Sequence, residues 1–238
     1  MDSNLERILP RPTKINCLER IKFLDIPITS VVDVGVNSQT VELVVFFPHL
    51  KHYLFDASFY EDLIKQNYHN IDHEFISSPL SDKTEQKYLN IFAHFKEDQP
   101  SAGILSDEPL KAGCIMKVIP VQTKRFDEIG LNISPNFLLK IDTDGGEDKI
   151  IKGFGDIIRQ ASVVIIEVTF IEITNRIKEL ENNGFTLIDI VDSCYYGPLL
   201  HQCDAVFVRN DLLTKLKEEN KLPRWDNFEQ DKWILVNF

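Results

Sequence analysis

The sequence predicts an α/β fold in which helices cover both faces of a mostly parallel sheet. Short apolar runs rich in β-branched residues alternate with helical patterns, which is typical of parallel strands joined by crossover helices. Three runs, VVDVGV, FLLKI and SVVIIEV, are almost continuously hydrophobic. A strand covered on both faces loses the alternation of apolar and polar side chains, so we expect these three in the middle of the sheet.

Seven strands and four helices follow from these patterns. The strands are expected at residues 28–36, 51–58, 73–78, 136–143, 161–168, 185–193 and 203–210, and the helices at 40–47, 59–66, 147–159 and 174–182. In the third helix, Ile150, Ile151, Phe154, Ile157 and Ile158 recur at helical spacing and predict a single core-facing side. Gly184 is expected where the fourth helix ends.

The main domain is expected to cover residues 30–211. A helical or irregular extension over residues 1–29 precedes it, and a C-terminal arm over residues 212–238 follows. The stretch from 79 to 136 is too long for one crossover between strands, and its broken patterns predict long loops, which are often lids or binding loops. We expect an insertion here that forms part of the substrate pocket.

Composition narrows the class of protein. The chain has 238 residues, 43% of them hydrophobic, with a net charge of −11. This charge disfavours nucleic acid and anionic lipid as partners, and we see no apolar run that suits a signal peptide or a membrane span. Four scattered cysteines lack the spacing of a disulfide scaffold or a metal site. We expect a cytoplasmic protein with reduced cysteines and no metal.

The first predicted strand brings Asp33, Gly35 and Asn37 to the carboxyl edge of the sheet, just before a helix begins near Thr40. Ligands of open α/β sheets bind at this edge. Gly35 would let the backbone approach a ligand closely, and the N–H groups at the helix start would suit a carboxylate. An ordinary strand-to-helix turn also commonly carries glycine and asparagine and remains an alternative.

Asp56 stands 21 residues after Gly35, at the end of the second predicted strand. A carboxylate there can accept both hydroxyls of an adenosine ribose, in a nicotinamide cofactor as well as in S-adenosylmethionine. A dinucleotide fingerprint needs three glycines to seat the pyrophosphate, whereas this loop has one. The pattern therefore favours S-adenosylmethionine, and a nicotinamide-dependent oxidoreductase is the less favoured alternative.

The run LLKIDTDGGED holds the densest group of polar residues. Lys140 and Asp142 share one face of a buried strand because side chains alternate along it, and Asp142 should emerge at the same edge as Asp33. Asp144 and Glu147 stand where a helix begins, and there they would stabilise the helix start by about 0.5–2 kcal/mol.

Two further interpretations of this run concern chemistry. A calcium loop is disfavoured, because Gly146 stands at the fifth position and Gly153 replaces the bidentate glutamate at the twelfth. In a reaction site, Asp142 would orient a substrate hydroxyl and accept its proton, while Lys140 would hold the acid ionised or steer the substrate. We favour the reaction site for Asp142.

Taken in order, the segments DVGVNSQT, YLFDAS, ISSPLSD, VQTKRFDEIG, LLKIDTDGGEDKIIKGF, VVIIEV, ENNGF and QCDAVFVR resemble the FkbM family of methyltransferases over about residues 31–210. The most specific segment, LLKIDTDGGEDKIIKGF, is similar to that family's Lys-Ile-Asp-x-Glu-Gly-x-Glu signature. The resemblance implies a class I methyltransferase (Rossmann-like) fold of seven strands, the last antiparallel, with S-adenosyl-L-methionine over the first two strands. It also implies O-methylation, usually of a hydroxyl on a sugar or a natural-product scaffold.

The residue patterns and the resemblance together predict two sets of site residues. Cofactor binding is assigned to Asp33, Gly35, Asn37, Thr40, Asp56 and Ser78, and catalysis to Asp142, Lys140 and Glu147. The assignments of Ser78 and Glu147 are implied by the resemblance alone. The chain departs from the family pattern at Gln39, which replaces a second loop glycine, and at Asp56 and Asp144, which replace glutamates. A non-catalytic S-adenosylmethionine-binding or interaction module of the same fold is therefore a further alternative. We expect a small hydroxylated acceptor, with carbohydrate the favoured class.

Overall fold

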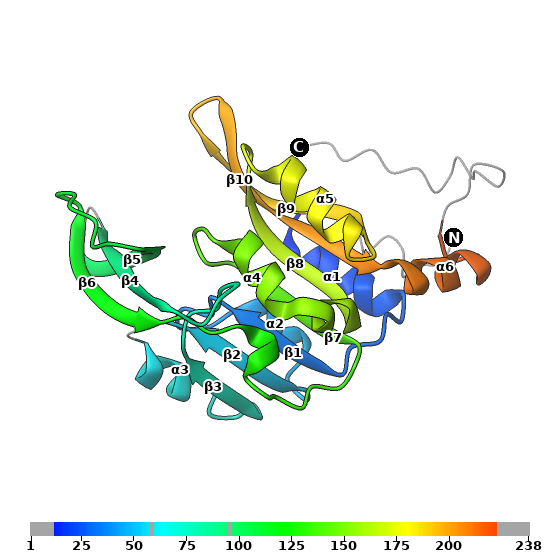
Figure 1. Cartoon of the computed structure of the whole chain (residues 1–238). Coiled ribbons are helices and arrows are strands. Elements are labelled where there is room, and N and C mark those ends of the chain that lie inside the picture. Colours follow the sequence, from blue (N-terminus) through cyan, green and yellow to red (C-terminus); the bar gives the residue numbers. More distant parts are fainter. Residues whose placement is uncertain (1–11, 58–59, 95–96, 223–238) are drawn as a thin grey trace. The chain divides into compact units, whose positions relative to one another are not determined.

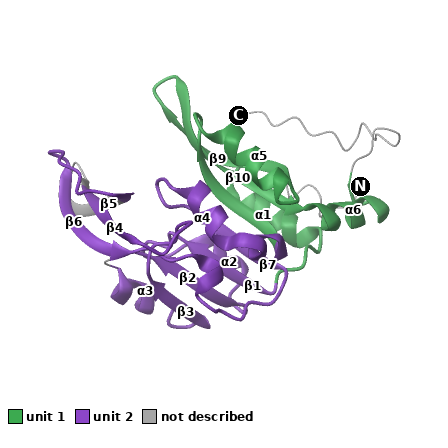
Figure 2. Cartoon of the chain, in the orientation of Figure 1, with its two compact units in different colours: residues 1–28, 162–238 green, residues 29–161 purple. Residues whose placement is uncertain are grey.

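The computed structural model describes residues 12–57, 60–94 and 97–222 (Figure 1). The chain divides into two compact units, shown in Figure 2: unit 1 comprises residues 1–28 and 162–238, and unit 2 comprises residues 29–161. A seven-stranded sheet supplies strands to both units, and a three-stranded sheet belongs to unit 2. The predicted α/β class with a mostly parallel seven-stranded sheet is confirmed.

Unit 2 contains the parallel part of the main sheet. Its strands are β1 (Ser30–Val34), β2 (Lys51–Asp56), β3 (His73–Ser77) and β7 (Phe137–Ile141), in the order β3-β2-β1-β7. All three pairings are parallel, so the carboxyl ends of these strands meet at one edge. Every residue of β1 and β7 is buried, as their continuous hydrophobicity predicted.

The helices of unit 2 are α2 (Val41–Phe46), α3 (Glu61–Asn67) and α4 (Glu147–Phe154), with 3₁₀ turns η1 (Phe126–Glu128) and η2 (Gly155–Gln160). The single helix predicted for residues 147–159 is wrong, because α4 ends at Gly155, whose φ of 54° is left-handed, and continues as η2. The predicted apolar side does face the core, where Phe154 stacks on Phe126 with ring centroids 3.9 Å apart.

Unit 1 contains the remaining three strands of the main sheet, whose two pairings with one another are antiparallel. These are β8 (Ala161–Thr169), β9 (Phe185–Tyr196) and β10 (Leu199–Arg209), in the order β8-β10-β9. The helices are α1 (Lys14–Phe23), α5 (Ile173–Asn182) and α6 (Asn210–Glu218). In Figure 1, α5 lies in front of these strands and α1 behind them, and both contact β9. Lys14 of α1 pairs with Asp204 of β10 at 2.7 Å.

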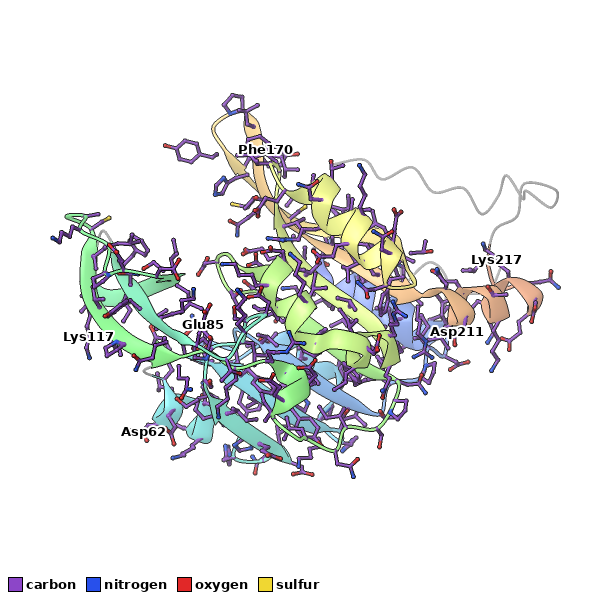
Figure 3. The ribbon with its side chains drawn as sticks, viewed as in Figure 1. Asp62, Glu85, Lys117, Phe170, Asp211 and Lys217 are labelled. Atoms are coloured by element: carbon purple, nitrogen blue, oxygen red, sulfur yellow. The ribbon has the colours of Figure 1, made fainter. Side chains whose placement is uncertain are left out.

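The tip of the hairpin formed by β9 and β10 is its least buried part. Tyr196 has 82% of its surface exposed at the tip, and Phe170, labelled in Figure 3 beside the hairpin, is 46% exposed. Residues 1–11 of the predicted N-terminal extension and residues 223–238 of the predicted C-terminal arm lie outside the described residues. Within the described ranges, no helix is both long enough and apolar enough to cross a membrane.

The segment between residues 79 and 136 differs from the prediction of long loops. It forms a second sheet from β4 (Gln86–His94), β5 (Glu97–Ser106) and β6 (Ile115–Gln122), paired antiparallel in the order β5-β4-β6. Figure 1 shows it as a curved sheet, separate from the main one. Many of the described side chains on its strands are half-exposed, and the charges and prolines among the apolar residues obscure the alternation typical of strands.

Candidate functional site

A cavity of about 530 Å³ lies within unit 2. It is bounded by the turn after β1, the end of β2, residues 78–81 after β3, the loop between β7 and α4, and part of the three-stranded sheet. This is the carboxyl edge of the parallel strands, where ligands of open α/β sheets bind. Of the predicted site residues, Gly35, Asn37, Asp56, Ser78 and Asp142 line it.

Lys140 joins the two predicted halves of the site. It pairs opposite Asp33 in the β1–β7 register, and its Nζ lies 3.3 Å from Asp33 Oδ1 and 3.3 Å from Asp142 Oδ2. The same Nζ donates a hydrogen bond of 3.3 Å to the carbonyl oxygen of Gly35. Lys140 therefore ties the turn after β1 to the loop after β7, as the strand alternation predicted for Asp33 and Asp142.

Lys140 is buried, and the carboxylates beside it keep it positively charged. Burial by itself would lower the pKa of Lys140, but the carboxylates of Asp33 and Asp142 outweigh burial and raise its pKa above the usual value. Asp33 is fully buried, so Lys140 supplies the positive charge that a buried carboxylate requires. Neither Asp33 nor Lys140 lines the cavity, whereas Asp142 does. The first two thus support the site from beneath its surface.

Glycine is required at residue 35 for a structural reason that the sequence did not reveal. Its φ is +81°, and a Cβ placed there would lie 1.7 Å from the carbonyl oxygen of Asp142. The prediction held that this glycine allows a ligand close to the backbone. The contact that forbids a side chain is instead with the β7–α4 loop, although Gly35 also lines the cavity.

Asn37 and Asp56 are joined at the ends of β1 and β2. Asn37 adopts a left-handed φ of 51°, and its N–H donates a hydrogen bond of 2.7 Å to Asp56 Oδ2. Tyr60, at the start of α3, also lines the cavity, and desolvation followed by the charge of Asp56 raises its pKa. These contacts place an oriented carboxylate and a phenol on the cavity wall beyond β2.

The loop between β7 and α4 is shaped by Glu147. The buried Glu147 accepts hydrogen bonds at Oε1 from the N–H of Gly145 (2.8 Å) and from Thr143 Oγ1 (3.2 Å). Asp144 adopts a left-handed φ of 56°, and partial desolvation followed by the charges of Asp142 and Glu147 raises its pKa. Glu147 does not line the cavity, so its geometry suits holding the loop that presents Asp142.

The remaining predicted cofactor residues divide between the cavity and the interior. Ser78 is buried at the cavity wall, and its hydroxyl donates to the carbonyl of Gln122 at 3.0 Å. Thr40 lies away from the cavity, and its N–H donates to Tyr68 Oη at 3.2 Å. Gln39, which departs from the family pattern, turns its amide to the carbonyl of Asn67 and also lies outside the lining. The structure therefore does not bring Thr40 together with the other predicted residues.

The charges on the cavity wall suit a cationic ligand. Five aspartates line the cavity, against two lysines: Asp56, Asp107, Asp142, Asp144 and Asp148 against Lys87 and Lys149. This acidic surface opposes a pyrophosphate and favours a cation. The sulfonium and amino group of S-adenosylmethionine are cationic, and the oriented Asp56 carboxylate can accept ribose hydroxyls, so the residues present fit this cofactor.

Sequence reasoning missed several residues of the lining. Tyr60 follows Asp56 by four residues, and an aromatic residue that close to a predicted ribose acid was the available signal. Lys87, Leu89, Ile91 and Leu105 come from the three-stranded sheet. Their place on the cavity wall depends on strand pairing between distant segments, for which the local sequence gives no signal.

The chain is similar to known methyltransferases. The family model for the methyltransferase FkbM domain matches residues 21–187. Among solved structures, an rRNA methylase from Streptococcus thermophilus is similar at 10% identity and a TM-score of 0.46, over 84% of this chain and 97% of that one. The N-methyltransferase NodS from Bradyrhizobium japonicum WM9 is similar at 8% identity and a TM-score of 0.45, over 87% and 98%. No curated protein matches the chain.

The family model matches residues 21–187, which is well above half of the chain. It includes every residue predicted for the site, from Asp33 to Glu147, and both loops that Lys140 connects. The resemblance inferred from the LLKIDTDGGEDKIIKGF segment is therefore confirmed. The chain belongs to the FkbM methyltransferase domain family.

Proposed function

We propose that this S-adenosylmethionine-dependent methyltransferase methylates a hydroxyl group on a small acceptor, a sugar or a hydroxylated natural-product moiety. Methyl transfer follows from family membership, whereas the hydroxyl and the class of acceptor are the proposal. The observation that carries it is the position of Asp142, which lines the cavity and whose partly exposed carboxylate is tied through Lys140 to the carbonyl of Gly35.

The proposed mechanism assigns a separate task to each polar residue. When bound, S-adenosylmethionine supplies the methyl group as an electrophile on sulfur. Asp142 orients the acceptor hydroxyl and takes its proton as the oxygen attacks. Lys140 fixes the position of the Asp142 carboxylate, and Glu147 fixes the loop that carries it. Much of the rate enhancement then comes from proximity and orientation in the cavity.

A small acceptor that is not a polyanion suits the same surface. The aspartates on the cavity wall and the net charge of −11 both oppose a nucleic acid. We also propose a cytoplasmic location, which is supported by four cysteines that are all free: Cys17, Cys114, Cys194 and Cys203.

The variant Asp142→Asn tests the proposed role. The amide keeps the size of the side chain but cannot accept a proton, so we expect turnover to fall about 100-fold or more. The dissociation constant of S-adenosylhomocysteine, measured by calorimetry, should change less than about threefold, because cofactor contacts are assigned to other residues. Turnover is measured with methyl-tritiated S-adenosylmethionine on a panel of sugars and alkyl glycosides.

Asp148→Asn is the matched control. Asp148 also lines the cavity, but its carboxylate lies 3.3 Å from Lys152 Nζ on the same helix. Turnover in this variant should stay within about threefold of the parent. Equal losses in both variants would mean that the acidity of the cavity, and not a base at residue 142, supports the reaction. Unchanged turnover in Asp142→Asn would remove Asp142 from the mechanism.

A further inference from the structure

The register of the three-stranded sheet determines which of its side chains share one side. Leu89 of β4 pairs with Leu105 of β5, and Ile91 pairs with Gly103. Directly paired residues of antiparallel strands project to the same side of a sheet, and their immediate neighbours project to the other. Leu89, Ile91, Gly103 and Leu105 therefore share one side, whereas the next pair, Asn90 and Ile104, projects to the opposite side. Ile104 also lines the cavity, and Asn90 does not.

The shared side is part of the cavity. All four of its residues line the cavity, and we call Leu89, Ile91, Gly103 and Leu105 the apolar wall. A Cβ at Gly103 would lie 2.9 Å from Leu89 Cδ1, so the glycine leaves room for the leucine on this wall. The ion pair between Lys87 and Asp107, which also line the cavity, borders the apolar wall on the same strands.

The apolar wall and the Asp142 loop favour different chemical groups. The wall offers no side-chain hydrogen-bond donor or acceptor and no aromatic ring, whereas saccharide hydroxyls need polar partners when they are buried. An aliphatic surface is stabilised by covering it with hydrocarbon, at roughly 25 cal/mol per Å². The residues that fit the cofactor, such as Asp56 and Asn37, belong to the edge of the main sheet instead.

We propose that the acceptor is amphipathic: an aliphatic hydrocarbon segment packs on the apolar wall while the reacting hydroxyl lies at Asp142. This inference rests on the proposed function and narrows its acceptor class to hydroxylated molecules that carry an alkyl or similar saturated chain. A free monosaccharide lacks such a segment and covers the wall poorly. The three-stranded sheet then selects the acceptor, and the main sheet carries the cofactor and the base.

Binding of n-alkyl β-D-glucosides tests the proposal without any turnover. The full chain, loaded with S-adenosylhomocysteine, is titrated by calorimetry with the methyl, hexyl and octyl glucosides below their micelle concentrations. We expect no measurable binding of the methyl compound and saturable binding of the longer ones, with a dissociation constant about four- to tenfold lower for octyl than for hexyl. Equal affinity for methyl and octyl glucoside would overturn the proposal.

Two apolar residues on opposite sides of the three-stranded sheet provide the matched variants. Val118 of β6 pairs with Asn90, on the side opposite to the apolar wall, and lies outside the cavity lining. Leu105→Asn should weaken octyl glucoside about tenfold, whereas Val118→Asn should change it less than about twofold. Leu105→Met keeps an apolar side chain and should retain the chain-length dependence, which guards against a general loss of folding in Leu105→Asn. Octyl binding that is unaffected by Leu105→Asn would contradict the proposal.

The apolar wall could alternatively contact the cofactor. The affinity for S-adenosylhomocysteine distinguishes this interpretation from the proposal. If the apolar wall covers the cofactor, Leu105→Asn will weaken S-adenosylhomocysteine and leave octyl glucoside unchanged, which overturns the proposal. Because binding is measured without methyl transfer, failure of the proposed function would appear separately, as unchanged turnover in Asp142→Asn.

Discussion

Two regions form the walls of the cavity: the carboxyl edge of the main sheet and the three-stranded sheet. They differ in how tightly their backbone and charged groups are packed. At the edge, backbone meets backbone at Gly35 and Asp142, and a buried lysine sits between two carboxylates. In the three-stranded sheet, the glycine at 103 faces only the end of a leucine side chain, and Lys87 pairs with Asp107, whose side chain is 85% exposed. The edge has little freedom to change, whereas the second sheet can vary.

This difference suits a division of labour between cofactor and acceptor. A reaction common to a family needs the cofactor loop and the base at fixed positions, and tightly packed backbone with buried charge fixes them. Acceptors differ, and a surface of flexible aliphatic side chains can be altered with little effect on folding. The rigid region therefore fits the chemistry, and the adaptable region fits the choice of acceptor.

Replacing Gly35 and Gly103 by alanine tests the difference in rigidity between the two regions. Of the predictions, this one has the largest expected effect on folding free energy. In Gly35→Ala, the new Cβ would meet a backbone oxygen at 1.7 Å on a residue with positive φ, so we expect a loss of at least about 4 kcal/mol of folding free energy. In Gly103→Ala, the Cβ meets Leu89 Cδ1 at 2.9 Å, and a small rotation relieves the contact, so the loss should stay below about 1 kcal/mol.

Urea unfolding followed by circular dichroism measures both glycine variants. Because Gly103 lies in the apolar wall, its variant should also show altered affinity for octyl glucoside while remaining folded. Similar losses of stability at the two positions would show that the edge is no more constrained than the three-stranded sheet.

Methionine at the two lysines gives the next largest effect. Lys140→Met leaves Asp33 buried without its cation, which we expect to cost about 3 kcal/mol of folding free energy. The double variant Lys140→Met/Asp33→Asn should recover part of this loss, because no buried charge remains. Lys87→Met removes ion pairs with partly exposed carboxylates, and its unfolding midpoint should remain close to that of the parent.

The same measurements decide whether Lys140 is charged in the folded protein. Its raised pKa means that the stabilisation is fully present below the pKa of an unfolded lysine and is lost only as pH rises through the higher folded value. The difference between the parent and Lys140→Met should therefore not decline as pH rises from 6 to 9. A difference that declines within this interval would contradict a charged Lys140.

The two regions also differ in how far the sequence predicted them. The strands that lead to Asp33 and Asp142 were predicted because burial on both faces leaves long apolar runs. The meeting of Lys140 with Asp33 and Asp142 followed from alternation along a single strand. Both signals are local, so a single sequence contains them.

The features that were missed depend on contacts between distant segments. The clash that makes glycine necessary at residue 35 involves the carbonyl of residue 142, and the apolar wall exists only because Leu89 pairs with Leu105. Thr40 was predicted to bind the cofactor from its place at a helix start, yet tertiary packing directs its N–H to Tyr68. The assignment of Glu147 to catalysis stays a prediction, and the contacts of its carboxylate are with the loop between β7 and α4.

The smallest expected effect is a dependence of the free energy of unfolding on acid, to which the main sheet should contribute through a buried histidine. His52 of β2 is fully buried, and its Nε2 lies 3.0 Å from the carbonyl oxygen of Phe47. Burial lowers the pKa of His52 below the usual value. Between the unfolded and the folded pKa, the unfolded chain binds more protons, so stability falls as pH decreases below about 6.5. The buried polar residue of the three-stranded sheet, Asn90, carries no titrating group and adds no such response.

His52→Gln isolates this contribution. Glutamine can donate to the carbonyl of Phe47 but does not titrate, so the variant should lose less folding free energy than the parent between pH 7.5 and pH 5.5. Urea unfolding at the two pH values gives the comparison, with the exposed His69 changed to glutamine as the control. His52 belongs to the main sheet, whereas the apolar wall contains no titrating side chain. The free energy of unfolding should therefore fall with acid, while the affinity for octyl glucoside should not change. Parallel shifts in both would mean that the two sheets respond as one unit.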